Sequence, residues 1–397
     1  MLKFAGLLAA AVLYGGTPAL ASESATTSPA PPPPPLQAPV PLAPAAPPSS
    51  TPSAPNPPAT AATARDGKPQ AAEAGEAAHI ALLLPLDSPA FAKHAEAVRS
   101  GFLAAAKVDG SRTLPVRTYA TGDEPQQVVE AYIKALGAGA SAVVGPLTRD
   151  GVTAVAESTT VLVPTLALNV PEGRSASAPE MYMLNLQAEA EARQVAQLAY
   201  QDGYRRALTI NGDTPLLIRI HQAFVEEFTR LGGVHVAEQA FSTGQSSLNR
   251  MKQAATTTAP DMAFLALDVP RARLACAYLG ALALYATSQV YPGNAGPLAG
   301  FDLAGVRFLD MPWLLQPDHA AVMAYPRPDY RDAIELERFY ALGIDAFRVV
   351  QALFAGRADA ALDGVTGRLT LGRDRNFIRG LTAAQFTDGK LVVRERP

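Results

Sequence analysis

Short apolar runs alternate with amphipathic stripes along residues 79–397, and this alternation predicts an α/β fold. The run Ile80–Leu84 is continuously apolar and ends at Pro85, which suits a strand buried on both faces of a parallel sheet. Similar runs follow, so strands are expected at 80–84, 116–119, 142–144, 161–168 and 181–186. The helices between them are expected to bury two stripes: Phe91, Ala95, Val98, Phe102 and Ala105, then Val129, Tyr132, Ile133 and Leu136.

The pattern starts again near residue 188, which predicts a second lobe. Its expected helices are 188–201, 217–231, 248–255 and 271–282, and its expected strands are 207–210, 235–241, 262–267 and 284–290. This order predicts two mainly parallel sheets flanked by helices, with right-handed crossovers. A last helix should cover 342–353, and short antiparallel strands at 367–371 and 391–393 should flank the turn pair Asp388-Gly389.

The chain is expected to cross between the lobes more than once. The first lobe should comprise about 79–187 plus 320–355. The second should comprise about 188–318 plus 356–397.

The first 21 residues resemble a secretory signal. Lys3 precedes the uncharged, mostly apolar run Phe4–Tyr14, and Ala19-Leu20-Ala21 places small residues where a signal peptidase reads them. The apolar run is too short to cross a hydrocarbon core of about 30 Å. Cleavage after Ala21 and a periplasmic location are therefore expected. No cysteine follows the run closely. We expect no direct lipid anchor, so that any association with the outer membrane or cell wall runs through partners.

Residues 22–78 form a segment rich in proline and alanine. Fifteen of the 35 prolines fall between Pro29 and Pro58, and such a segment cannot bury a core. We expect a disordered tail, which serves either as a spacer in the cell envelope or as an inert linker.

Charge and motifs exclude several classes of function. Residues 79–397 carry 30 basic and 32 acidic side chains, which argues against a nucleic-acid partner. The five histidines show no metal-ligand spacing, and no nucleophile elbow or phosphate loop is present, so no metal, no cofactor and no enzyme are expected. The single cysteine, Cys276, lies in an apolar helical stretch and is expected to be a small buried hydrophobe.

Five motifs carry a resemblance to a known family. They are Ile80–Leu86, Val143–Leu147 with Val163–Asn169, Phe308–Trp313, Phe339–Ala346 and Gly364–Leu369. The opening resembles type I periplasmic-binding-protein folds, and the whole set, in order, resembles the LppC family, the penicillin-binding protein activators of the LpoA type. The resemblance implies a two-lobed, non-enzymatic regulator that binds a class A penicillin-binding protein and stimulates peptidoglycan synthesis. Better-known family members carry a lipidated cysteine and a large helical-repeat domain, and this sequence shows neither.

The loops after the expected strands supply the candidate binding residues of a cleft between the lobes. These candidates are Asp87, Ser88, Phe91, Thr148, Asn169, Asn185, Asp213 and Asp268. Four of them, Ser88, Thr148, Asp213 and Asp268, precede expected helices, so capping is the alternative role. Asp87 and Phe91 are expected to crowd the mouth of the cleft, and the first helix lacks a glycine before Gly101. Tight binding of an amino acid is therefore not expected.

Two functions from different classes remain open. One is the regulator that docks on a penicillin-binding protein. The other is the solute-binding protein of an ABC transporter for an amino acid or a similar small ligand, because the same two-lobed scaffold hosts both.

Overall fold

The structure is a computed structural model that describes residues 77–109, 113–158, 161–173, 178–291, 293, 297–330 and 333–394. These described residues belong to one compact unit. The expected signal segment, 1–21, and nearly all of the expected linker, 22–78, lie outside the described residues. None of the helices in the described ranges is both long and apolar enough to cross a membrane.

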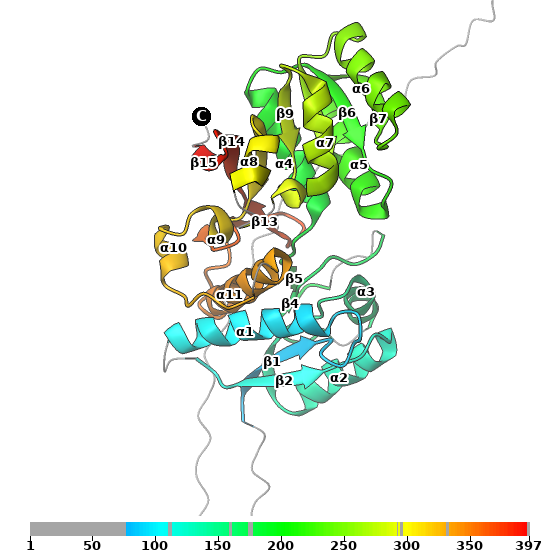
Figure 1. Cartoon of the computed structure of the whole chain (residues 1–397). Helices are drawn as coiled ribbons and strands as arrows, with labels where there is room; N and C mark the ends of the chain where they lie inside the picture. The colour runs from blue at the N-terminus through cyan, green and yellow to red at the C-terminus, as the bar shows by residue number, and fades with distance from the viewer. Residues whose placement is uncertain are drawn as a thin grey trace, which may run out of the picture. The chain divides into compact units, whose positions relative to one another are not determined.

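The first lobe is built on a five-stranded parallel sheet in the order β2-β1-β3-β4-β5. Its elements follow the predicted alternation of strand and helix (Figure 1). Their bounds are β1 (His79–Leu84), α1 (Ala92–Asp109), β2 (Val116–Ala120), α2 (Pro125–Gly137), β3 (Ala140–Val144), α3 (Arg149–Glu157), β4 (Thr165–Ala167) and β5 (Met181–Met183).

The second lobe is built on a seven-stranded sheet in the order β15-β14-β10-β9-β8-β6-β7. The strands from β7 to β10 are parallel, and β14 and β15 are antiparallel. The bounds of the first part are α4 (Ala188–Gln201), β6 (Arg206–Asn211), α5 (Pro215–Arg230), β7 (Val234–Ala240), α6 (Gln245–Thr257), β8 (Met262–Ala266), α7 (Val269–Leu279), β9 (Ala283–Ala286), the 3₁₀ helix η1 (Ser288–Val290), α8 (Pro297–Asp302) and β10 (Val306–Asp310).

The chain after β10 contributes elements to both lobes. Helix α11 packs along α1, whereas β14 and β15 extend the second sheet (Figure 1). A third sheet, β11-β12-β13, contributes Leu369 and Phe377 to the same core as α1 and α11, and the connection between β11 and β12 contributes Val365. The bounds are α9 (Pro312–Leu315), α10 (Ala320–Met323), α11 (Ile334–Phe354), β11 (Leu362–Asp363), β12 (Arg368–Leu371), β13 (Phe377–Gly380), β14 (Thr382–Thr387) and β15 (Lys390–Arg394). The expected residue limits of the lobes stay a prediction.

The predicted fold class is confirmed, and the burial of β1 explains why the sequence predicted it. Ile80, Leu82 and Leu84 point into the core with α1 and α11, whereas Ala81 and Leu83 point into the core with α2 and α3. All five side chains are fully buried, as a parallel strand covered by helices on both faces requires.

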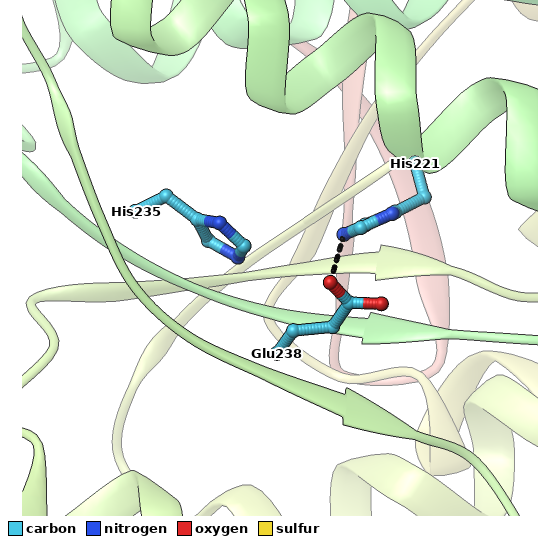
Figure 2. A group of neighbouring side chains, drawn as sticks. All are labelled: His221, His235 and Glu238. Atoms are coloured by element: carbon cyan, nitrogen blue, oxygen red, sulfur yellow. Dashed lines mark ion pairs between the residues drawn. The ribbon is translucent and has the colours of Figure 1, made fainter.

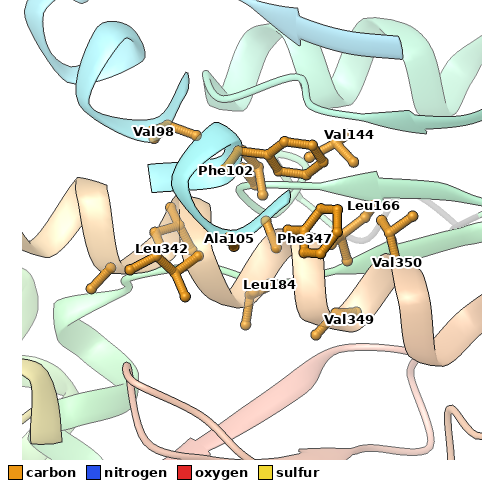
Figure 3. Packing of buried hydrophobic residues seen from close by; sticks show 14 of the residues in the cluster. Val98, Phe102, Ala105, Val144, Leu166, Leu184, Leu342, Phe347, Val349 and Val350 are labelled. Atoms are coloured by element: carbon orange, nitrogen blue, oxygen red, sulfur yellow. The ribbon is translucent and has the colours of Figure 1, made fainter. Parts of the chain in front are cut away.

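Helix α1 buries most of the predicted stripe. Val98, Phe102 and Ala105 face α11, and the rings of Phe102 and Phe347 meet edge to face with centroids 5.3 Å apart (Figure 3). Phe91 does not join this core. It precedes the helix, and 42% of its surface is exposed.

Helix α2 buries a different face from the one predicted. Val128, Tyr132 and Ala135 are buried, whereas Ile133 is 49% exposed. Consecutive helical residues point about 100° apart, so a helix turned to bury Val128 and Tyr132 directs Ile133 away from the sheet. The prediction was based on large apolar side chains, so it left out the small Ala135, which is buried.

Candidate functional site

The cleft between the lobes is the main hollow of functional interest. It has a volume of about 930 Å³ and is lined by residues of both lobes. The first lobe contributes Leu147, Thr148 and Asn169 beside α3, and the second contributes residues near the starts of α4, α5 and α7. Side chains of η1, β10 and α11 line it as well.

Half of the predicted site residues line this cleft. The four that do are Phe91, Thr148, Asn169 and Asp268. The four that are absent from its lining are Asp87, Ser88, Asn185 and Asp213. Ligand binding by any of the eight stays a prediction.

Asp87 does not crowd the mouth of the cleft, which corrects the expectation. Its side chain is exposed, and its backbone N–H donates to Thr121 O at 3.0 Å. That bond ties the loop to the end of β2, the edge strand of the first sheet, on the far side of β1 from β3. The loop therefore lies at the edge of the sheet at Asp87 and reaches the cleft only at Phe91, which lines it as expected.

Three of the predicted residues make the hydrogen bonds of local caps. Ser88 Oγ accepts from Phe91 N at 3.0 Å, and Thr148 Oγ1 accepts from Gly151 N at 3.3 Å. Asp268 Oδ1 accepts from Arg271 N at 3.1 Å, and its other oxygen accepts from the Arg271 guanidinium. These oxygens satisfy backbone groups that helix starts leave free.

Asp213 is not a cap, contrary to the alternative considered for it. Thr214 caps α5 instead, because its Oγ1 accepts from Leu217 N at 3.3 Å. The Asp213 side chain is 82% exposed and pairs with Arg271 Nη2 at 3.1 Å. The helix begins one residue later than the acidic residue suggested, because Pro215 occupies its first turn.

The two asparagines hold loops in place. Asn169 Nδ2 donates to Leu147 O at 3.0 Å, which joins the loops after β3 and β4 at the cleft wall. Asn185 is buried, and its Nδ2 donates to Asn376 Oδ1 at 3.0 Å while its Oδ1 accepts from Gln187 N. Its bonds therefore connect the first crossing segment to the loop before β13.

A carboxylate of α4 bridges two arginines at the cleft, and the sequence analysis missed it. Glu189 Oε1 lies 2.7 Å from Arg219 Nε of α5 and 3.6 Å from Arg149 Nη2 of α3. Burial acts to raise the pKa of Glu189, but a backbone hydrogen bond and the two arginines outweigh it and lower that pKa. The three charges connect the two lobes.

A second charged cluster lies at the base of the cleft. Arg338 of α11 donates to Asp310 Oδ2 at 2.7 Å and to Ser288 O at 3.3 Å, so it links α11 to the second lobe. Glu191 of α4 accepts from the N–H and the hydroxyl of Ser288. Burial, together with the Asp310 carboxylate, raises the pKa of Glu191 to about 7.

The buried Arg379 of β13 completes this cluster. It donates to Thr366 O at 3.3 Å, and burial lowers its pKa even though Glu191 and Asp310 act to raise it. The cluster comprises Glu191, Ser288, Asp310, Arg338 and Arg379, and of these only Asp310 lies in one of the five sequence motifs. No local sequence pattern marks the other four as a site, because their partners are remote in the sequence.

The cleft is poorly suited to capture a ligand carboxylate. Three of its four arginines pair with carboxylates of the chain: Arg149 and Arg219 pair with Glu189, and Arg338 pairs with Asp310. The fourth, Arg379, is buried and donates to Thr366 O. Asp268 adds a further carboxylate to the lining. Cys276 lies outside the lining, and burial raises the pKa of its thiol to about 12, which leaves it protonated and a poor nucleophile.

The sequence motifs meet one another around the cleft. Asp345, from the motif in α11, accepts from Val365 N, Thr366 N and Thr366 Oγ1, which belong to the last motif. Trp313 N, from the motif after β10, donates to Val365 O at 2.9 Å. Gly145, from the motif after β3, has a φ of 111°, and a Cβ there would overlap Leu83 O. Two of these contacts join the C-terminal motifs to one another, and the third holds β1 and the end of β3 close together.

The family model described as "LppC putative lipoprotein" matches residues 55–254 and 266–389. The chain belongs to the LppC family. A curated relative, the penicillin-binding protein activator LpoA of Pectobacterium parmentieri, is 28% identical over 331 residues. The alignment covers 71% of this chain and 48% of the relative, so the chain spans about half the length of the curated relatives it matches.

Two solved structures share the fold. One, from Chromobacterium violaceum, is described as "a putative branched-chain amino acid ABC transporter". It is 41% identical, covers 78% of this chain and 99% of its own, and has a TM-score of 0.68. The other is the C-domain of LpoA from Haemophilus influenzae, described as a regulator of PBP1A. It is 22% identical, covers 80% of this chain and 100% of its own, and has a TM-score of 0.66.

Proposed function

We propose that this protein is a non-enzymatic periplasmic regulator that binds a class A penicillin-binding protein and stimulates peptidoglycan synthesis. Membership of the LppC family carries the proposal, because the curated relatives are named penicillin-binding protein activators. The matched part of the chain corresponds in fold to the LpoA C-domain over that domain's whole length. The regulatory surface would then lie on the lobe pair.

The charged cluster at the base of the cleft favours the regulator over a solute-binding protein whose lobes close on a ligand. A solute-binding protein of this type opens and closes its lobes around a ligand, which here would work against the buried pair between Arg338 and Asp310. Opening the lobes would have to separate Arg338 from Asp310 and rehydrate both charges. A lobe pair held in this way offers a fixed surface to a partner.

A regulator without catalytic groups acts through its binding energy. It shifts the synthase between conformations only by the difference between its affinities for them. The near balance of charge over residues 79–397 favours apolar and hydrogen-bonded contacts over long-range steering. Stimulation should therefore tolerate moderate salt.

Transport is the second candidate function, and the 41% identical structure from Chromobacterium violaceum favours it. A cleft of about 930 Å³ has room for an amino acid. Against this function, three of the four cleft arginines are already paired with Glu189 or Asp310, and the fourth, Arg379, is buried.

The regulator proposal is tested with purified class A synthases from the same cell. Rates of glycan polymerisation and peptide cross-linking are measured with and without this protein. A two-lobed solute-binding protein of similar size serves as the control for nonspecific effects. We expect a complex and a higher rate with at least one synthase. No complex and no rate change with any of them would overturn the proposal.

The transport proposal is tested by thermal unfolding in the presence of amino acids. A ligand at about 100 times its dissociation constant would add ~2.7 kcal/mol to the free energy of unfolding. We expect no concentration-dependent shift with leucine, isoleucine or valine. A clear shift with any of them would favour the transport function.

The periplasmic location is part of the proposal. It rests on the signal-like segment 1–21 and on the description of the family as lipoproteins. Cell fractionation tests it, with the protein expected in the periplasmic or the outer-membrane fraction. Recovery in the cytoplasm would contradict it.

A further inference from the structure

Two histidines and a glutamate meet in the second lobe, away from the cleft. His221 lies on α5, and His235 and Glu238 lie on β7, the edge strand of the second sheet (Figure 2). One ligand atom from each of the three lies within 4.8 Å of the other two. None of the three lines the cleft.

A β-bulge brings the two β7 residues to one face. Residues three apart on a regular strand point to opposite faces, so His235 and Glu238 would not meet. In the pairing with β6, Ala207 lies opposite His235 and Leu208 lies opposite Ala237, which leaves Val236 as the extra residue. The bulge restores a common direction for the two side chains, and for this reason their spacing along the chain carried no metal signal.

The Nε2 atoms of both imidazole rings point toward the hydroxyl of Thr209. His221 Nε2 and His235 Nε2 each lie 2.9 Å from Thr209 Oγ1 of β6. Glu238 Oε2 lies 3.8 Å from His221 Nε2. The threonine hydroxyl can donate to one of these nitrogens and accept from the other, so it holds both Nε2 atoms close to one point.

The three side chains differ in their exposure to solvent. His221 is buried and His235 is half-buried, so the two imidazoles lie at the inner side of the group. The Glu238 side chain is 48% exposed, which leaves it free to rotate toward a cation.

We propose that His221, His235 and Glu238 form a binding site for one Zn²⁺ ion. Tetrahedral zinc with bonds of ~2.0–2.1 Å places its ligand atoms about 3.3 Å apart, so modest side-chain rotations bring these atoms into range. Two imidazoles and one carboxylate suit zinc, whereas calcium and magnesium require oxygen ligands. The exposed side of the site leaves a fourth position for water.

Zinc bound by these three residues would stabilise the edge strand β7 of the second sheet against α5. Its ligands join α5 to β7, and among the described strands β7 pairs with β6 alone. Metal binding would therefore raise the resistance of the second lobe to unfolding, with no contact to the cleft. The proposal is independent of the regulator function.

The test is a titration of the purified full chain with Zn²⁺, followed by calorimetry, and with Co²⁺, followed by visible absorption. We expect one ion per chain, a raised unfolding midpoint and the intense absorption of tetrahedral cobalt. His235→Ala should weaken zinc binding at least roughly 100-fold, since loss even of a group that only supports a ligand costs about 10–100-fold.

Glu238→Gln and His319→Asn complete the experiment. Glu238 is exposed, so its replacement should leave the fold intact while removing the anionic ligand and the cobalt spectrum. His319 pairs with Asp363 at 3.8 Å, the same distance as His221 and Glu238, but has no second histidine in that pair, and asparagine can keep its capping role at α10. Zinc binding by Glu238→Gln and His235→Ala at wild-type strength, or its loss in His319→Asn alone, would overturn the proposal.

Discussion

Glu191 couples the charge at the base of the cleft to pH. Burial, together with the Asp310 carboxylate, raises its pKa to about 7 in the folded chain, whereas an unfolded glutamate loses its proton near pH 4.5. Between these values the folded state holds a proton that the unfolded state has lost. The free energy of unfolding must therefore fall as the pH rises through this window.

Glu191→Gln removes this titration. Relative to the wild type, the variant should gain up to about 3 kcal/mol of stability between pH 4.5 and pH 8, because each unit of pKa shift corresponds to ~1.4 kcal/mol. The glutamine oxygen can still accept from Ser288 N, and its amide NH2 can donate to the Ser288 hydroxyl. Urea unfolding of both proteins across this range measures the effect. A difference in stability that does not change with pH would show that Glu191 is ionised throughout.

At the scale of single residues, local roles could be predicted and remote partners could not. Thr148 and Asp268 cap helices that begin next to them, so the sequence carried the signal. Glu191, Arg338 and Asp310 come from three elements far apart in the chain. Their meeting depends on how the lobes cross, which no local pattern encodes.

Two glycines set the distance between α1 and α11. A Cβ at Gly101 would overlap the carbonyl oxygen of Tyr340, and a Cβ at Gly343 would overlap that of Val98. The helix backbones therefore touch directly. Gly101→Ala should cost about 1–3 kcal/mol, because the helices must move apart and loosen the contact of Phe102 with Phe347.

Gly137→Ala is the matched control for this prediction. Gly137 is also helical, but a Cβ there would meet nothing within 4 Å, so alanine should add a few tenths to about 1 kcal/mol through helix propensity. Chemical denaturation of the two variants measures the difference. Equal stability of Gly101→Ala and Gly137→Ala would refute the close approach of the helices.

At the scale of elements, apolar runs predicted the parallel strands because both faces of those strands are buried. The same logic failed at 284–290, where the predicted strand ends at Ala286 and η1 follows. Ser288 N donates to Glu191 and Ser288 O accepts from Arg338, so these bonds take the place of strand pairing. A tertiary contact decided the local structure there.

At the scale of the whole molecule, the fold leaves two functions open because both use two lobes and a cleft. A solute-binding protein binds its ligand in the cleft, whereas a regulator can bind the synthase through its outer surface. Three of the four cleft arginines are paired with carboxylates of the chain itself, which favours the outer surface. A variant that fills the cleft therefore separates the two functions.

Leu216→Trp is such a variant. Leu216 lies in the first turn of α5, is half-buried and lines the cleft, so an indole there projects into the space a solute would occupy. A regulator that docks through its outer surface should stimulate the synthase to the same extent in the variant as in the wild type. Polymerisation assays on both proteins measure this, and Ile218→Trp, on the same helix but absent from the cleft lining, is the control for the added ring. Loss of stimulation in Leu216→Trp alone would place the synthase contact in the cleft.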